Sequence, residues 1–81
     1  MTPDRIARGI RAKELLDDSI MSEAFGAAER EYFMAFINAA HDDDALRRSC
    51  QNKILALHEV RKRLRSIVND GTEAAMQNER A

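Results

Sequence analysis

The sequence has few of the residues that usually mark a disulfide scaffold, a turn-rich fold or a membrane span. Its 81 residues contain one cysteine, one proline, three glycines and no tryptophan. The single Cys50 has no partner for an intrachain disulfide, so we expect it to pack as a reduced thiol. No uncharged run approaches the roughly 18 residues of a membrane span, and no apolar signal-type segment follows the N-terminus. The chain therefore predicts neither membrane insertion nor secretion.

Motifs of catalysis and cofactor binding are also missing. The sequence has no Gly-rich phosphate loop, no cysteine pair and no spaced carboxylate dyad. The one grouping of metal-ligand type, His41–Asp44, is better interpreted as a set of acids at a helix start. His58 is interpreted as a boundary residue, and His41 with Cys50 or Ser49 lacks an orienting third group. We expect no enzyme, no cofactor and no bound metal.

The chain instead has a helix-forming composition. It is 44% hydrophobic and 33% charged, and the abundance of Ala, Leu, Glu, Arg and Lys favours helices throughout. A chain of this length folds as one small domain that buries only about 60% of its unfolded surface. The sequence thus predicts a single all-α domain over residues 1–81 with a thin margin of stability.

The strongest pattern predicts a basic amphipathic helix over about 45–69. Seven basic residues and one acid lie between Ala45 and Val68, a local charge of +6. Asn69-Asp70-Gly71 predicts its end, with Gly71 as a left-handed cap, and leaves 72–81 as a flexible tail. Its core positions advance by alternating steps of four and three, as in a helix packed along its length on another helix, and are Leu46, Cys50, Lys53, Leu57, Val60, Leu64 and Ile67.

Two more helices are predicted before it. Thr2-Pro3-Asp4 is typical of a helix start, and the first helix covers about 3–17. Gly9 weakens the middle of that helix by about 1 kcal/mol. Asp18 or Ser19 then caps a second helix over about 20–39, unless a bend joins the two into one continuous helix.

The second helix is apolar over more of its circumference than one partner helix covers. One stripe matches the rhythm of the third helix and contains Met21, Phe25, Ala28, Tyr32, Ala35 and Ala39. A second stripe contains Ile20, Ala24, Ala27, Phe33, Phe36 and Ile37. A connection as short as 40–44 makes the second and third helices antiparallel neighbours. We therefore predict an antiparallel helical hairpin with a short N-terminal helix, and an oligomer with Phe33, Phe36, Ile37 and Tyr32 at its interface.

Basic residues form a second candidate surface. The heptad pattern places the basic residues of 61–65 on the outer face of the third helix, where solvent or the acids Glu29 and Glu31 balance their charge. No aromatic residue lies among them, so base stacking with a nucleic acid is not favoured. The candidate contacts to a nucleic acid or an acidic protein are Arg5, Arg8, Arg11, Arg61, Lys62 and Arg65.

Several short segments resemble a group of small helical proteins encoded by tailed bacteriophages and prophages. The pattern R-A-x-x-L-L-x-D matches 11–18, E-A-F matches 23–25, and V-R-x-x-L matches 60–64 before Gly71. The chain departs from the group at Asp18-Ser19, where many members have Asp-Pro, and lacks an aromatic residue near Cys50. The resemblance implies a phage gene from the region for particle assembly and DNA packaging, and it implies no catalytic residue.

Three hypotheses follow. The first is a non-enzymatic, self-associating protein that serves particle assembly or DNA packaging through protein contacts, with itself or with another phage or host protein. The second is a nucleic-acid-binding packaging accessory similar to a small terminase subunit. The third is a phage-made inhibitor of a host protein or defence signal. All three predict a location in the host cytoplasm, and the first also allows incorporation in the virion.

Overall fold

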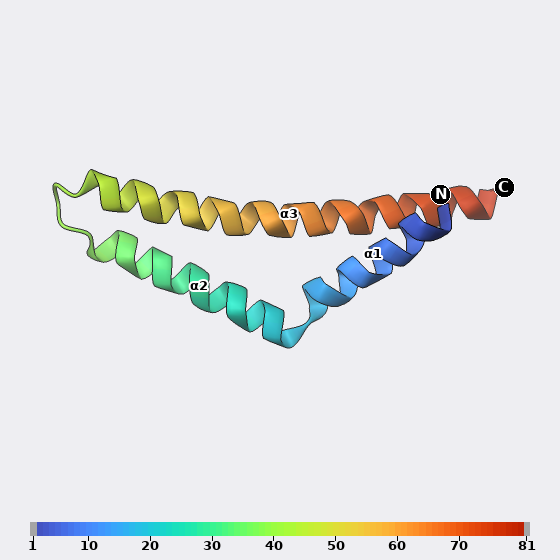
Figure 1. The fold of residues 1–81 in the computed structure, drawn as a ribbon, viewed down its shortest axis with the longest axis horizontal. Coiled ribbons are helices and arrows are strands. Elements are labelled where there is room, and N and C mark those ends of the chain that lie inside the picture. The colour runs from blue at the N-terminus through green and yellow to red at the C-terminus, as the bar shows by residue number, and fades with distance from the viewer. Residues whose placement is uncertain (1, 81) are drawn as a thin grey trace.

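The structure, a computed structural model, describes residues 2–80 and consists of three helices. These are α1 (Thr2–Asp17), α2 (Ser19–Asn38) and α3 (Asp44–Arg80). Across these residues no strand is present, so the all-α prediction is confirmed. Figure 1 shows α1 and α2 placed end to end as a bent arm, with α3 running back along both of them.

The bend between α1 and α2 lies at Asp18. This residue has extended backbone angles, φ −66° and ψ 128°, and its carboxylate accepts a hydrogen bond from the Met21 N–H at 2.9 Å. The bond satisfies one of the free N–H groups at the start of α2. The sequence left Asp18 and Ser19 as alternative caps, and the structure selects Asp18. The arm is furthest from α3 at this bend (Figure 1).

The turn between α2 and α3 is held by capping bonds of the kind expected from its acids. Asp43 Oδ1 accepts from the Leu46 N–H at 3.1 Å. Arg47 donates to the carbonyl oxygens of Ala40 and His41 at 2.7 and 2.8 Å, and it pairs with Asp44. Among residues 2–80, no three His, Cys, Asp or Glu side chains are arranged so that they could hold a metal ion together.

The face that α3 turns toward the arm differs from the predicted one at three of its seven positions. Cys50 is 3% exposed, and Leu57, Leu64 and Ile67 are half-buried, as expected. Leu46 and Val60 are 40% and 46% exposed, and Lys53 is exposed as well. The positions one residue further along than these three are half-buried instead, and they are Arg47, Ile54 and Arg61. The prediction failed there because two of these positions carry arginines, whose long apolar stems pack while their charged ends find acceptors.

The predicted end of the third helix at 69–71 is also wrong. α3 continues to Arg80, and Gly71 has an ordinary helical backbone without a positive φ. A Cβ on Gly71 would lie 2.9 Å from the Arg5 carbonyl oxygen and 2.9 Å from Gly9 Cα. Glycine is required here because two helix backbones meet, not because a helix ends. Ala74, within the expected tail, is fully buried.

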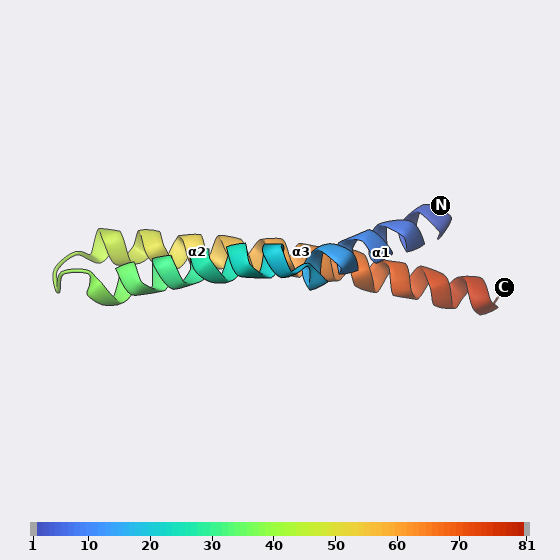
Figure 2. The ribbon, with the colours of Figure 1, turned by 90° about the horizontal axis from the view of Figure 1, so that it is seen from below.

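The molecule is a thin slab rather than a globule. Its extents are 60 × 22 × 14 Å and its radius of gyration is 17.6 Å, whereas a compact domain of this length has a radius of gyration of about 12 Å. The edge-on view in Figure 2 shows α2 lying over α3 along half of the slab. The thickness is close to the 10–12 Å or so of one helix. Two broad faces therefore remain open to solvent.

Candidate interaction surfaces

Little apolar surface is buried within the chain. The fully buried hydrophobic side chains among residues 2–80 are those of Ala12, Cys50 and Ala74, and no large side chain joins them. Many large hydrophobic residues stay exposed, which are Ile10, Ile20, Phe33, Met34, Ile37, Leu46, Leu55, Val60 and Met76. A slab with this distribution leaves its main hydrophobic residues available for a partner.

The candidate interface residues of α2 divide into two groups. Phe33 and Ile37 are 54% and 55% exposed, and Phe36 is half-buried beside them. Tyr32 lies in the contact between α2 and α3, where the Lys53 Nζ is 5.2 Å from the centroid of its ring. The structure thus brings Phe33, Phe36 and Ile37 together at the surface and separates Tyr32 from them.

Ile54 of α3 shares a broad face with these residues. Glu29, Phe33 and Phe36 form one stripe on α2, because they are four and three positions apart. Ile54, His58, Arg61 and Arg65 form a stripe on α3 by the same rule. The ion pair between Glu29 and Arg61 joins the two stripes and so places them on one side of the slab. We call Phe33, Phe36, Ile37 and Ile54 the apolar patch.

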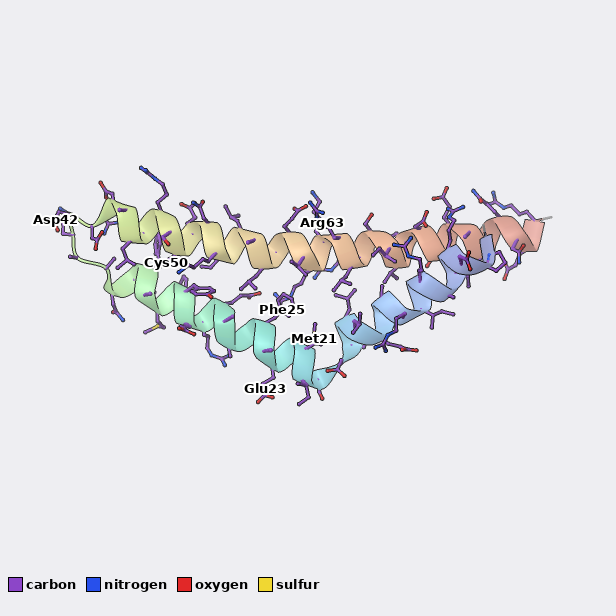
Figure 3. The ribbon with its side chains drawn as sticks, in the orientation of Figure 1. Met21, Glu23, Phe25, Asp42, Cys50 and Arg63 are labelled. Atoms are coloured by element: carbon purple, nitrogen blue, oxygen red, sulfur yellow. The ribbon has the colours of Figure 1, made fainter. Side chains whose placement is uncertain are left out.

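Arg61 is an internal residue of the α2–α3 contact. It pairs with Glu29, and its guanidinium carbon lies 4.8 Å from the centroid of the Phe25 ring. Both charged side chains are about three-quarters buried, at 26% and 27% exposed. The prediction that Arg61 lies on the outer face is therefore wrong, whereas the predicted balance of its charge by Glu29 is confirmed. Figure 3 shows Phe25 turned toward α3 and Arg63 turned away from the arm.

The contact between α1 and α3 is built on small residues. Gly9 and Gly71 approach so closely that a Cβ on Gly9 would lie 2.9 Å from Gly71 Cα. Ala12 and Ala74, each three positions further along its helix, are buried on either side. This spacing of Gly and Ala allows two helix backbones to pack at a short distance. The paired small residues were visible in the sequence, but nothing indicated that they face each other.

An ion pair beside this crossing holds α1 in register. The Arg5 Nε donates to Asp70 Oδ2 at 3.1 Å, and its Nη2 donates to Asp70 Oδ1 at 2.8 Å. These hydrogen bonds lower the pKa of the Asp70 carboxyl from its usual 3.8 and raise the pKa of Arg5. A two-pronged arginine–carboxylate pair fixes orientation as well as distance. Arg5 therefore has a role within the fold.

Of the six candidate basic residues, three form ion pairs within residues 2–80 and three do not. Arg5 and Arg61 pair with acids on other helices, and Arg11 pairs with Glu14 of its own helix. The remaining candidates form no ion pair with another described residue, and they are Arg8, Lys62 and Arg65. Lys62 and Arg65 line a shallow depression with His58 and Arg61 on α3. We call His58, Lys62 and Arg65 the basic cluster.

His41 and the two candidate nucleophiles, Cys50 and Ser49, do not share one environment. Cys50 is buried against α2, whereas His41 and Ser49 are exposed at the turn and on α3. Cys50 points into the space between the two helices (Figure 3). Its packing role is consistent with the sequence interpretation.

Comparison with known proteins adds no identification. No protein-family model matches this chain, and neither a curated protein nor a solved structure matches it. In the part of the chain that the structure describes, no helix is long and apolar enough to cross a membrane.

Proposed function

We propose that this protein is a non-enzymatic helical module that works by association with further copies of itself. In this proposal α2 and α3 form an antiparallel hairpin, and the apolar patch of one copy is covered by another copy. The observation that carries the proposal is the lack of a core: no large side chain is fully buried in residues 2–80. A domain of this size needs such burial to offset its loss of conformational entropy.

The surface area supports the same proposal. The chain exposes 6239 Å², whereas a compact monomer of its mass exposes about 4,900 Å². The difference, about 1,300 Å², is larger than the roughly 800 Å² that each partner buries in a standard interface. A second copy therefore has enough surface to cover without any change in the fold.

The biological setting rests on the sequence resemblance alone. The segments at 11–18, 23–25 and 60–64 resemble small proteins of tailed bacteriophages. We accordingly propose a role in particle assembly or DNA packaging through protein contacts, in the host cytoplasm or within the virion. An inhibitor of a host protein would use the same apolar patch, and a partner-capture experiment distinguishes it by finding a host protein on the patch.

Nucleic-acid binding receives less support. Three of the six candidate arginines and lysines are engaged in ion pairs inside the chain. The formal net charge is −1, so the protein has no general attraction for phosphate. A complex with DNA that persists at physiological salt and is weakened by reversal of Lys62 and Arg65 would favour this alternative.

Sedimentation equilibrium of the full chain tests the proposal. We expect a mass of at least twice 9.2 kDa at micromolar concentration. Phe33→Ser should shift the chain toward monomer, because it places a hydroxyl in the apolar patch. Met34→Ser is the matched control: Met34 is a neighbouring residue of the same helix, 52% exposed, and lies outside the patch.

The outcomes separate the proposal from its alternatives. Wild-type and Met34→Ser chains that associate alike, with Phe33→Ser weaker by about tenfold or more in dissociation constant, support it. Circular dichroism of each variant shows whether the helices persist. A wild-type chain that stays a folded monomer at every concentration contradicts the proposal.

A further inference from the structure

We infer that two copies pack as an antiparallel symmetric dimer in which the acidic turn of each copy lies on the basic cluster of the other. The inference rests on the proposed self-association and adds its geometry. The acidic turn consists of Asp42, Asp43 and Asp44. The basic cluster consists of His58, Lys62 and Arg65, as defined above.

The position of the apolar patch sets the centre of the dimer. The patch occupies the half of the slab nearest the turn, with Phe33, Phe36 and Ile37 on α2 and Ile54 opposite on α3. A two-fold axis through this patch brings the apolar patch of one copy into contact with the apolar patch of the other. Symmetric dimers of this kind are the commonest oligomers. The arrangement covers the exposed Phe33 side chain in both copies at once.

Helix geometry then determines what faces the turn. Asp44 lies eight residues before position 52 of α3, which is level with the patch centre, and this corresponds to about 12 Å along the helix. In an antiparallel partner, the same distance on the other side of the axis reaches position 60. The partner's turn therefore lies beside the segment from His58 to Lys62, with Arg65 less than two turns from position 60.

The charges at these two places are complementary. Three consecutive acids occupy the turn, and Asp42 forms no ion pair within residues 2–80. Lys62 and Arg65 also lack an ion-pair partner there, although they are exposed on the same side as the patch. A parallel dimer would bring turn onto turn and cluster onto cluster, so like charges would oppose it. The segregation of charge along the chain thus selects the antiparallel orientation.

Cysteine cross-linking tests the geometry directly. The variant Asp42→Cys/Lys62→Cys is treated with a short bis-maleimide reagent, with wild type in parallel to measure reaction at the buried Cys50. Within one chain positions 42 and 62 are about 30 Å apart along α3, too far for a short linker. We expect a covalent dimer, and no ladder of larger species, because the symmetric contact is closed.

The matched control is Asp42→Cys/Arg63→Cys, which adds the same number of thiols. Arg63 is adjacent in sequence, but it points away from the arm (Figure 3). Less cross-linked dimer from the control than from the first variant supports the inference. Equal yields, a ladder of higher species, or no dimer from the first variant overturns it.

A charge-exchange experiment provides an independent readout. Lys62→Glu/Arg65→Glu and Asp42→Lys should each weaken the homodimer about tenfold, and low salt should enlarge the effect. Mixing the two variants should restore association, because the mixed dimer has one original and one exchanged contact. Wild type that dimerises while the mixture stays as weak as either variant overturns the geometry alone. Monomeric wild type overturns the proposed function as well.

Discussion

Gly9 and Gly71 determine how closely α1 approaches α3. Their Cα atoms meet at a distance that leaves no space for a methyl group, and the obstructing atoms belong to backbone. From the sequence, Gly9 is interpreted as a residue that weakens the first helix, and Gly71 as the residue that ends the third. Neither interpretation detects a packing role, because the requirement for glycine arises from a residue more than 60 positions away.

Gly9→Ala is expected to destabilise the protein. Overpacking against a backbone costs about 1–3 kcal/mol, which exceeds the roughly 1 kcal/mol that alanine contributes as a better helix former. Gly26→Ala is the control, because its new Cβ would meet only the end of the Arg30 side chain, at 4.0 Å. Urea unfolding at a fixed protein concentration should show a net loss of up to about 2 kcal/mol for the first variant and a gain for the second. Equal gains for both would disprove the close crossing.

The Arg5–Asp70 ion pair makes the stability of the folded chain depend on pH. Hydrogen bonds from Arg5 lower the pKa of Asp70 in the folded chain, so its contribution is present above the unfolded value near 3.8 and is lost as the pH falls through the lowered value. Asp70→Asn removes this contribution. The difference in unfolding midpoint between wild type and Asp70→Asn should therefore be largest near neutral pH and shrink below pH 4. A difference independent of pH would show that the pair does not act through this carboxylate.

At the scale of elements, alanine substitutions can test which residues of α3 form its contact face. Leu57 and Leu64 are half-buried under the arm, whereas Val60, between them in sequence, is 46% exposed. Leu57→Ala and Leu64→Ala should each reduce the free energy of unfolding by about 1–3 kcal/mol, less than for fully buried leucines. Val60→Ala should cost about 0.5 kcal/mol or less. A cost for Val60→Ala equal to that of the leucines would restore the contact face expected from the sequence.

The sequence predicted α2 better than α3, for a physical reason. All six residues of the first predicted stripe are half-buried, five of them on α2 and one directly after its end, and they are Met21, Phe25, Ala28, Tyr32, Ala35 and Ala39. That stripe is entirely apolar or aromatic, so its periodicity indicates a single buried face of the helix. On α3 two adjacent stripes could form the contact face, one through Arg47 and Arg61 and the other through Leu46 and Val60. Hydrophobicity favours the second stripe, but the structure uses the first because the arginines find carbonyl and carboxylate acceptors.

The exposure of the candidate surface residues agrees with the sequence analysis in part. Phe33 and Ile37 were identified because a second apolar stripe exceeded what one helix covers, and both are exposed in the chain. Arg61 was misplaced, since its pairing with Glu29 depends on the register between α2 and α3. The sequence gives charge and polarity at each position, but the register that decides which charges are neutralised arises only when helices pack.

At the scale of the whole molecule, shape is the main finding. The chain is 14 Å thick and 60 Å long, and both broad faces are open. A single layer of helices has no interior, so its large side chains stay at the surface. Folding of this chain is therefore expected to be coupled to association, with the second copy providing the missing layer.

Unfolding measured at several protein concentrations tests this claim most directly. If association and folding are coupled, the denaturant midpoint rises with concentration, because the folded oligomer is favoured by mass action. Guanidinium unfolding followed by circular dichroism from about 1 to 100 µM should show this rise for wild type, and a smaller one for Phe33→Ser. A midpoint that stays constant across the whole range, together with a folded species of 9.2 kDa, would contradict the account.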